Sequence, residues 1–516
     1  QSFDPLYGGF GPAPKFPPTG QLELLMRLFH REGELDYGVM VSRTLHKMAQ
    51  GGIYDHLGGG FARYSTDAAW QIPHFEKMLY DNALLALNYM DAFLVLKDPF
   101  FLQIAEETLM WVITDLQSLD GGFYSSRDAD SEGVEGKFYL WSWDEIKESL
   151  SYDEFELVNR ILDLHPQGNF NGANILRMKA SWEDLATQIG WSVEKLQMHW
   201  QPIKEKLRLI RSHRIPPARD EMILSDWNGL AIAALSRAYR LTGKDLYLNS
   251  AHTAAQFIFH QLWRAAEGLT EPKSAVPILY HRWWKGNAGI RGMLDDYAFM
   301  MLGLVELYFA DFDPQWIKWC CELSQSLETW LAVETYPNSK LNASGGFYNS
   351  PNEDLGIIRF YNAYDSSVPS GNAIAGIVFW ILWQLTGKIQ YRHRAEAIAE
   401  SFSGNLADNP TAHLKLAILI DHITQPTYQI VLALPNNEPL KNFLRIINSK
   451  YLPHVVKAVR CFDSLGNYPA TSDEIIELLK GKESINHNPT LYICRDFVCE
   501  APIIGITAIE NALSAL

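Results

Sequence analysis

The densest group of chemically competent side chains lies in a glycine-rich loop and in the helix predicted after it. Pro73 fits the first turn of a helix, where its missing N–H costs nothing. In such a helix His74, Lys77 and Asp81 would share one face, with Glu76 on a neighbouring stripe. A histidine beside carboxylates at a helix entry is typical of an acid/base site. A capped helix start with buried, hydrogen-bonded polar groups would give the same pattern.

The same loop also supplies side chains suited to holding a ligand. Aromatic rings stack on the apolar faces of a ligand, and charged or amide groups bind the ligand's polar atoms. The candidates for binding a substrate are Tyr54, His56, Arg63, Trp70 and, on the predicted helix, Asp81.

A second loop places three carboxylates within five residues: Asp128, Asp130 and Glu132. In an extended segment alternate side chains share one face, so these groups could form a site. A solvated acidic turn is the alternative. The spacing is superficially similar to a calcium loop, but the full twelve-residue pattern is absent, and we expect no metal. Asp128 and Asp130 join His74 and Glu76 as catalytic candidates.

Three further motifs stand at predicted helix starts and combine Asp or Asn with an aromatic or small residue. Good N-cap residues occur in all three, so capping alone could explain them. Rings next to carboxylates also suit sugar recognition. Asp296 is a further catalytic candidate, and the substrate-binding candidates in these motifs are Asp226, Trp227, Asn228, Asp295, Tyr297 and Asn372. Asp365, an acidic residue of the long loop at 344–372, is one more.

Helices must position these groups, because helical periodicity runs from about residue 20 to residue 425. Short helix–helix turns alternate with long loops, and three long loops open on Gly-Gly-aromatic cues, at 51–54, 121–124 and 345–348. The pattern predicts a mainly α fold, an (α/α)6 toroid of the six-hairpin glycosidase-like type, with all long loops on one rim. An irregular helical solenoid is the alternative.

The predicted barrel covers residues 1–426 and carries an insertion at about 137–220. From residue 427 the hydrophobic period changes to two, with strands predicted at 429–434, 454–462 and 490–494. Residues 427–516 are therefore predicted to form a small α/β region.

Composition excludes several classes of function. The net charge of −16 disfavours nucleic-acid and anionic-membrane binding, and the sequence contains no apolar stretch long enough to span a bilayer.

Five cysteines give no disulfide framework, and Cys494 and Cys499 do not form a CxxC motif, so we expect reduced thiols and a cytoplasmic location. No nucleotide-binding or zinc-protease motif is present, and we expect no cofactor.

Several long motifs, in order along almost the whole chain, carry a family resemblance. They include Gly11–Pro17, Gly51–Tyr64, Pro73–Asn82, Gly121–Gly133, Asp226–Gly229, Asp295–Ala298, Pro369–Asn372 and Tyr492–Pro502. These motifs resemble the spermatogenesis-associated protein 20 family. The resemblance implies a thioredoxin-like domain before the Pro-Lys-Phe-Pro segment, a partner that this sequence lacks. It also implies a likeness to six-hairpin glycosidases and N-acylglucosamine or cellobiose 2-epimerases, which agrees with a toroid.

The leading hypothesis is a carbohydrate-active protein that binds a small, sugar-like ligand at the rim. A 2-epimerase needs an acid and a base on opposite faces of C2; His74, with His56 nearby, is one candidate, while His281 is equally consistent with packing. A glycosidase needs two carboxylates about 5–10 Å apart. The alternative is a non-catalytic scaffold that presents the thioredoxin-like domain.

Overall fold

The computed structural model describes residues 2–265, 276–333, 345–352, 359–435, 440–460 and 472–515. Its contacts divide the chain into two compact units. Unit 1 comprises Gln1–Gln117 and Tyr124–Glu221, and unit 2 comprises Ser118–Phe123 and Met222–Leu516. The division falls inside the predicted 1–426 barrel, so the predicted domain boundaries stay a prediction. Within the described ranges, no helix combines the length and apolarity needed to cross a membrane.

Unit 1 contains two helix pairs joined by short turns. Gly33 closes the first pair in the left-handed conformation, which glycine adopts without steric cost. In the second, Asp98 caps the returning helix through the Phe100 amide, and Pro99 occupies the first helical position. The elements are α1 (Thr19–Glu32), α2 (Leu35–Gln50), α3 (Leu79–Leu96), α4 (Pro99–Trp111) and the π-helical turn η1 (Val112–Leu116).

Short strands precede α3 where a helix was predicted, and that prediction was wrong. Residues 73–78 are extended because they pair with other segments: β2 with β1, and β3 with β4. Helix α3 begins only at Leu79, so His74 and Lys77 do not share a helix face with Asp81. The strands of this unit are β1 (Tyr64–Ser65), β2 (Pro73–His74), β3 (Lys77–Met78), β4 (Ser126–Arg127), β5 (Asp130–Ser131), β6 (Val134–Glu135) and β7 (Arg219–Asp220).

Four further helices of unit 1 surround a hydrophobic core of their own, centred on Trp141, Val158, Leu196 and Leu207. Each begins after a serine whose side chain accepts a backbone N–H: Ser142, Ser151, Ser181 and Ser192. The helices are α5 (Trp143–Ser149), α6 (Tyr152–Ile161), α7 (Trp182–Ile189) and α8 (Val193–Arg211).

Unit 2 repeats the helix-pair design three times. Its short turns contain Gly243, Phe312 or Gly387 in the left-handed conformation. The helices are α9 (Ser225–Thr242), α10 (Asp245–Gln261), α11 (Leu294–Asp311), α12 (Pro314–Leu331), α13 (Gly371–Thr386), α14 (Ile389–Asp408), the 3-10 turn η3 (Pro410–Ala412) and α15 (Leu414–Thr424). A sheet of β8 (Ile223–Leu224), β9 (Trp263–Arg264), β10 (Ile278–Trp284) and β11 (Asn287–Arg291) accompanies them.

Two glycines allow α9 and α11 to pack with their backbones in contact. A Cβ placed on Gly303 would lie 2.6 Å from the carbonyl oxygen of Gly229, and one placed on Gly229 would lie 2.4 Å from the carbonyl carbon of Phe299. Contacts this short exclude any larger residue without movement of a helix. The close crossing brings the first turns of both helices together.

We expect Gly229→Ala to reduce the free energy of unfolding by about 1–3 kcal/mol, because the added methyl group must push two helices apart. Gly404→Ala is the matched control: a methyl group added at Gly404, in α14, would meet no atom within 4 Å, and there alanine should stabilise the chain by about 0.5–1 kcal/mol. Urea unfolding followed by circular dichroism measures both. Equal shifts in the same direction would contradict the close crossing.

The C-terminal region has the α/β composition that its sequence pattern predicts. Strand β12 (Tyr428–Ala433) pairs in parallel with β13 (Val455–Arg460) and antiparallel with β14 (Thr490–Arg495). The predicted strand at 454–462 therefore agrees over residues 455–460; His454 lies in a turn, and residues 461 and 462 lie outside the described ranges. The remaining elements are β15 (Val498–Cys499), β16 (Ile503–Ile504), α16 (Lys441–Ile447), α17 (Ser472–Ile475), the 3-10 turn η4 (Glu477–Leu479) and α18 (Ile506–Ala515).

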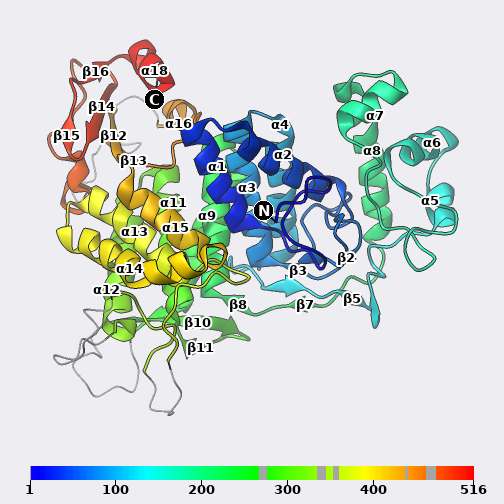
Figure 1. Ribbon diagram of the computed structural model, residues 1–516, viewed down its shortest axis with the longest axis horizontal. Coiled ribbons are helices and arrows are strands. Elements are labelled where there is room, and N and C mark those ends of the chain that lie inside the picture. The colour runs from blue at the N-terminus through cyan, green and yellow to red at the C-terminus, as the bar shows by residue number, and fades with distance from the viewer. Residues whose placement is uncertain are drawn as a thin grey trace. The chain divides into compact units, whose positions relative to one another are not determined.

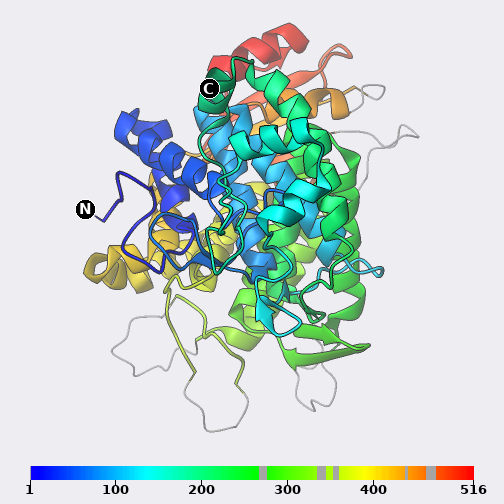
Figure 2. The same cartoon turned by 90° about the vertical axis from the view of Figure 1, so that its right-hand side faces the viewer.

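The mainly α fold class predicted from the sequence is confirmed (Figure 1 and Figure 2). Helical hairpins recur in both units, and the small α/β region follows them in the chain.

Candidate functional site

The long Gly-Gly-aromatic loops are held by an asparagine in the first turn of a following helix. In each case the side-chain oxygen accepts the phenylalanine N–H at 2.7–2.8 Å, and the side-chain N–H donates to the phenylalanine C=O at 3.0–3.1 Å. The pairs are Asn82 with Phe61, Asn228 with Phe123, and Asn372 with Phe347.

These contacts correct the predicted binding roles of Asn228 and Asn372. Both side chains are fully buried, and their amide groups also donate to the C=O groups of Leu224 and Asn362. The backbone therefore occupies both donors and acceptor, and the two residues position loops. In the first loop the equivalent motif is Gly59-Gly60-Phe61 rather than the predicted cue at 51–54.

Three predicted carboxylates meet where α9 and α11 begin. The backbone N–H of Asp226 donates to Oδ1 of Asp296 at 3.2 Å, and the N–H of Met293 donates to Oδ2 at 2.8 Å. Asp295 lies next to this pair in the first turn of α11, with its Oδ1 so close to Gly371 that a Cβ there would stand 2.2 Å away. Gly371 begins α13, so three helix starts contribute to one cluster.

His281 completes the cluster from strand β10. Pairing of Arg282 with Leu224 places β10 beside the residue that precedes α9, which brings His281 to the carboxylates. Its Nδ1 donates to both oxygens of Asp296, at 2.9 and 3.1 Å. Burial alone would lower the pKa of His281, but the hydrogen bond and charge of Asp296 raise it to about 9. At neutral pH this ring is therefore a cation.

The two other carboxyl groups of the cluster favour their protonated forms. Burial and the neighbouring charge of Asp296 raise the pKa of Asp295 to about 7, against a weaker opposing hydrogen bond from the Gly371 amide. Burial and the same charge also raise the pKa of Asp226 well above its usual value. Asp295 is partly exposed, whereas Asp296 is 1% exposed, so Asp295 is the more accessible acid. We name the cluster of Asp226, His281, Asp295 and Asp296 the carboxylate cluster.

The carboxylate cluster also contains a possible set of metal ligands. One donor atom from each of Asp226, His281 and Asp296 lies within 4.8 Å of the others, a spacing that a cation could bridge. In the structure the Nδ1–H of His281 bridges these groups instead, because it donates to both oxygens of Asp296. A metal would have to replace that proton.

A second group of predicted residues meets in unit 1. His74 contacts Glu135 through Nδ1 at 2.8 Å and stacks on Tyr64, while Arg63 pairs with Glu76 at 3.2 Å. Asp81 is close enough to Arg63 to interact with its charge: burial raises the pKa of Asp81 well above the usual value, although Arg63 opposes this. Strand pairing, rather than a shared helix face, therefore brings Arg63, His74 and Glu76 together, and Asp81 joins them from the first turn of α3.

The acidic loop is a solvated hairpin. Asp128 and Asp130 are exposed, and Glu132, at the turn between β5 and β6, forms an exposed ion pair with Lys137. Each carboxylate therefore keeps most of its hydration, and the solvated-turn interpretation fits better than a site. Glu135 of the same hairpin, which sequence reasoning did not select, is the residue that reaches His74.

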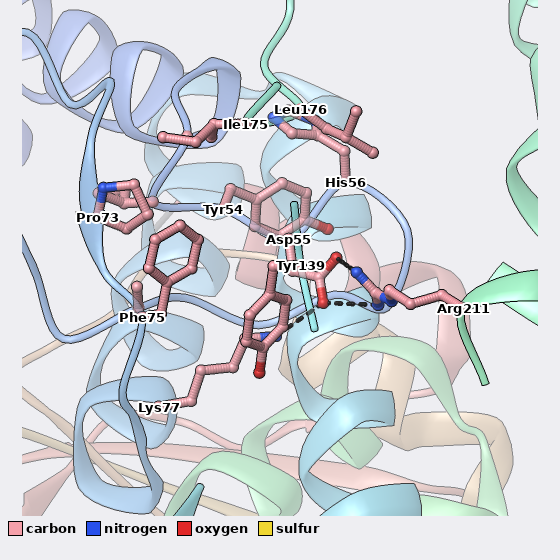
Figure 3. A pocket seen from close by; sticks show the side chains of 13 residues that line it. Tyr54, Asp55, His56, Pro73, Phe75, Lys77, Tyr139, Ile175, Leu176 and Arg211 are labelled. Atoms are coloured by element: carbon pink, nitrogen blue, oxygen red, sulfur yellow. Dashed lines mark hydrogen bonds and ion pairs between the residues drawn. The ribbon is translucent and has the colours of Figure 1, made fainter. Parts of the chain in front are cut away.

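A buried ion network lines the pocket next to the first loop (Figure 3). Arg211 donates to both oxygens of Asp55 at 2.8 Å, and Lys77 donates to one of them at 2.9 Å. The three side chains are only 3–6% exposed. The cavity of about 30 Å³ admits a water molecule, whereas ligand sites usually measure about 300–1,000 Å³. This network therefore stabilises the unit.

The remaining predicted binding residues are engaged within the protein. Tyr54 donates to Glu107 at 2.5 Å, and Trp70 is fully buried and donates to the C=O of Tyr7. His56 is buried against the C=O of Gly51, and burial lowers its pKa to about 4.

Two predicted residues of unit 2 are similarly engaged. Tyr297 is buried and accepts the N–H of Leu279. Asp365 accepts the backbone N–H groups of Ser370 and Lys415, both at 2.9 Å. Of the candidates in this unit, Asp226, Trp227, Asp295 and Asp296 thus remain at or beside the carboxylate cluster.

Comparison with known proteins identifies relatives over nearly the whole chain. No protein-family model matches it. The chain is 29% identical to human spermatogenesis-associated protein 20 and 30% identical to the rat protein of that name, over 98% of its own length and 66% of theirs. It is also 30% identical to the uncharacterized protein B0495.5 of Caenorhabditis elegans, covering 99% of this chain and 71% of that one. The chain thus spans just under two thirds of the length of its mammalian relatives.

Solved structures with similar folds are far more distant in sequence. A family 76 glycoside hydrolase (mannosidase) from Bacteroides thetaiotaomicron aligns with a TM-score of 0.40 at 10% identity, covering 73% of this chain and 72% of that one. A sugar epimerase from a ruminal bacterium aligns with a TM-score of 0.30 at 11% identity, covering 72% and 88%. At these TM-scores neither structure bears on the chemistry of this chain.

Proposed function

This chain belongs to the family of spermatogenesis-associated protein 20, a name that describes no reaction, and we propose from its own side chains that it is a carbohydrate-active enzyme. The proposed active site is the carboxylate cluster, and the proposed chemistry is acid/base cleavage of a glycosidic bond. The observation that carries the proposal is the convergence of Asp226, His281, Asp295 and Asp296 where helices begin, with Asp295 partly exposed. Burial and the charge of Asp296 raise the pKa of Asp295 there to about 7.

Asp295 suits the role of general acid. A proton donor whose pKa lies near the working pH is substantially protonated and still releases its proton readily. In glycoside hydrolysis that proton goes to the oxygen that leaves with the departing sugar. Its accessibility compared with Asp296 makes Asp295 the group that a ligand can reach.

Asp296 suits the complementary role. Its charge raises the pKa values of both Asp295 and Asp226, so Asp296 is the ionised carboxylate of the cluster while the other two groups favour their protonated forms. A carboxylate held in this way can stabilise the positive charge that develops on the sugar ring.

His281 and Trp227 suit ligand binding. Asp296 fixes the ring of His281 through Nδ1, which leaves Nε2–H to donate to a sugar oxygen, since that atom makes no hydrogen bond within the described residues. Trp227 follows Asp226 directly and is partly exposed, and tryptophan rings stack on the apolar faces of sugars. We therefore expect an uncharged or acidic saccharide as ligand.

The same geometry disfavours 2-epimerisation. An epimerase base must be neutral at working pH, whereas His281 has a pKa of about 9 and donates to Asp296. His74 contacts Glu135, and His56 is buried against a backbone carbonyl. Neither His281 nor His56 therefore offers an accessible, neutral base to a substrate.

The test is proton NMR of the chain in heavy water with a panel of mono- and disaccharides and short oligosaccharides. Hydrolysis would produce new reducing-end signals, and Asp295→Asn protein, prepared identically, should not produce them. Asp128→Asn changes an exposed carboxylate and serves as the matched control. Deuterium entry at C2 would instead indicate epimerisation and overturn the hydrolase assignment. An unchanged panel at high protein concentration would favour the scaffold alternative.

A further inference from the structure

The C-terminal hairpin brings two cysteines together that the sequence interpretation treated as reduced thiols. Cys494 on β14 lies opposite Cys499 on β15, and the structure joins them in a disulfide. The expectation of reduced thiols is therefore corrected for this pair. Antiparallel pairing explains the bond, because the turn between the strands folds the four intervening residues back and sets the two cysteines face to face.

The register favours close approach of the two sulfur atoms. The adjacent pair, Ile493 with Glu500, is hydrogen bonded: the N–H of Glu500 donates to the C=O of Ile493 at 2.9 Å. Cys494 and Cys499 therefore occupy a non-hydrogen-bonded position, where opposing residues of antiparallel strands come closest.

The two cysteines differ sharply in exposure. Cys494 is 0% exposed, whereas Cys499 belongs to an exposed stretch at the end of the hairpin. A nucleophile from solvent can therefore reach Cys499 but not Cys494. Thiol–disulfide exchange requires access to one sulfur atom along the S–S axis, and the buried partner is then the leaving group.

The hairpin has anchors that do not depend on the disulfide. The N–H of Phe497, at the turn, donates to the side chain of Gln429 at 3.3 Å, and its ring packs edge-on against Trp383 of α13. Gln429 is fully buried and donates in turn to Gln384 of the same helix at 3.0 Å. Strand β14 is also paired with β12 and β16.

The disulfide is therefore a minor structural support. It links residues only five positions apart, and the stabilisation from closing so short a loop is smaller than that from a long one. Cleavage of the bond can leave the sheet, the turn and the contacts of Phe497 in place.

We propose that Cys494 and Cys499 form a reversible dithiol–disulfide site that exchanges electrons with an external dithiol. The thiolate of that dithiol attacks Sγ of Cys499, the S–S bond breaks, and Cys494 leaves as a thiolate that takes up a proton. The second thiol of the external molecule then attacks the mixed disulfide and releases Cys499. The external dithiol loses two electrons and two protons, and the cysteine pair gains both.

The test uses the intact chain under native conditions with dithiothreitol as the dithiol. Samples are quenched with N-ethylmaleimide over time, and mass spectrometry of the peptide containing both cysteines counts the adducts. We expect two adducts to accumulate at a rate proportional to the dithiothreitol concentration, while circular dichroism stays unchanged. Removing the dithiothreitol and adding oxidised glutathione should restore the unlabelled peptide.

A reduction rate independent of the dithiothreitol concentration and equal to the rate of unfolding would overturn the proposal. The disulfide would then be inaccessible in the folded chain and purely structural. Single variants test the asymmetry directly. The exposed thiol that remains in Cys494→Ser should react with maleimide at least about tenfold faster than the buried thiol that remains in Cys499→Ser. Equal reactivity would remove Cys499 as the point of attack.

Discussion

Asp295→Asn is expected to lower the turnover of the saccharide substrate by roughly 10²–10⁴-fold, the usual contribution of a general acid. Asparagine keeps an oxygen for the Gly371 amide but cannot supply a proton, so the fold should remain while the chemistry is lost. The measurement is kcat on the substrate that the NMR panel identifies, together with the melting temperature. We expect KM to change little. A variant with normal turnover would exclude Asp295 as the acid.

The pH dependence of the reaction provides a second readout of the same residue. A general acid works only while protonated, so with a pKa of about 7 for Asp295 activity should fall as the pH rises above 7. Any residual activity of Asp295→Asn should lack this descending limb. Asp128→Asn, which changes an exposed carboxylate, should keep both the turnover and the profile of the unmodified chain.

Local sequence patterns correctly located the helix starts of unit 2. Aspartates beside aromatic residues at the start of apolar helices predict a role for Asp226, Asp295 and Asp296, and the structure brings these three groups together. Their convergence depends on the glycine contact between α9 and α11, which is a property of two segments about 70 residues apart. A single sequence can therefore suggest the members of this cluster but not that the fold brings them together.

Contacts that are remote along the chain explain the residues that were missed or misassigned. His281 contacts Asp296 because β10 pairs with β8, and no local sequence pattern predicts that pairing. Asp55 meets Arg211 across 156 positions of sequence. Pro73 resembled the first residue of a helix, yet the pairing of residues 73–78 with neighbouring strands outweighed that local preference.

The asparagines show why residue type alone does not separate binding from structure. Asn228 and Asn372 carry the same amide groups that a sugar site would use, and both begin helices near glycine-rich loops. Their partners are the N–H and C=O groups of single phenylalanines, which makes them backbone clamps. The three-fold recurrence of the Gly-Gly-Phe motif with a later asparagine is the signal that could have identified this role.

Asp55→Asn is expected to cost about 3–5 kcal/mol of unfolding free energy, more than Gly229→Ala. The substitution leaves the buried cations Lys77 and Arg211 without their shared counter-charge, although the amide oxygen can still accept the backbone N–H groups of Leu57 and Gly58. Urea unfolding at pH 7 measures the difference. Asp128→Asn, which removes one exposed carboxylate, should change stability by less than about 0.5 kcal/mol.

The effect of Asp55→Asn should also depend on pH in a defined direction. Burial by itself would raise the pKa of Asp55, but Arg211 and Lys77 outweigh it and hold that pKa far below the usual value. The stabilisation is therefore complete above the unfolded-state pKa of about 3.9 and is lost as the pH falls below it toward the folded-state value. The difference between the unmodified chain and the variant should accordingly be constant from pH 5 to pH 7 and shrink in stronger acid. A pH-independent difference would mean that the lost free energy comes from packing and not from the charge that Asp55 places between two buried cations.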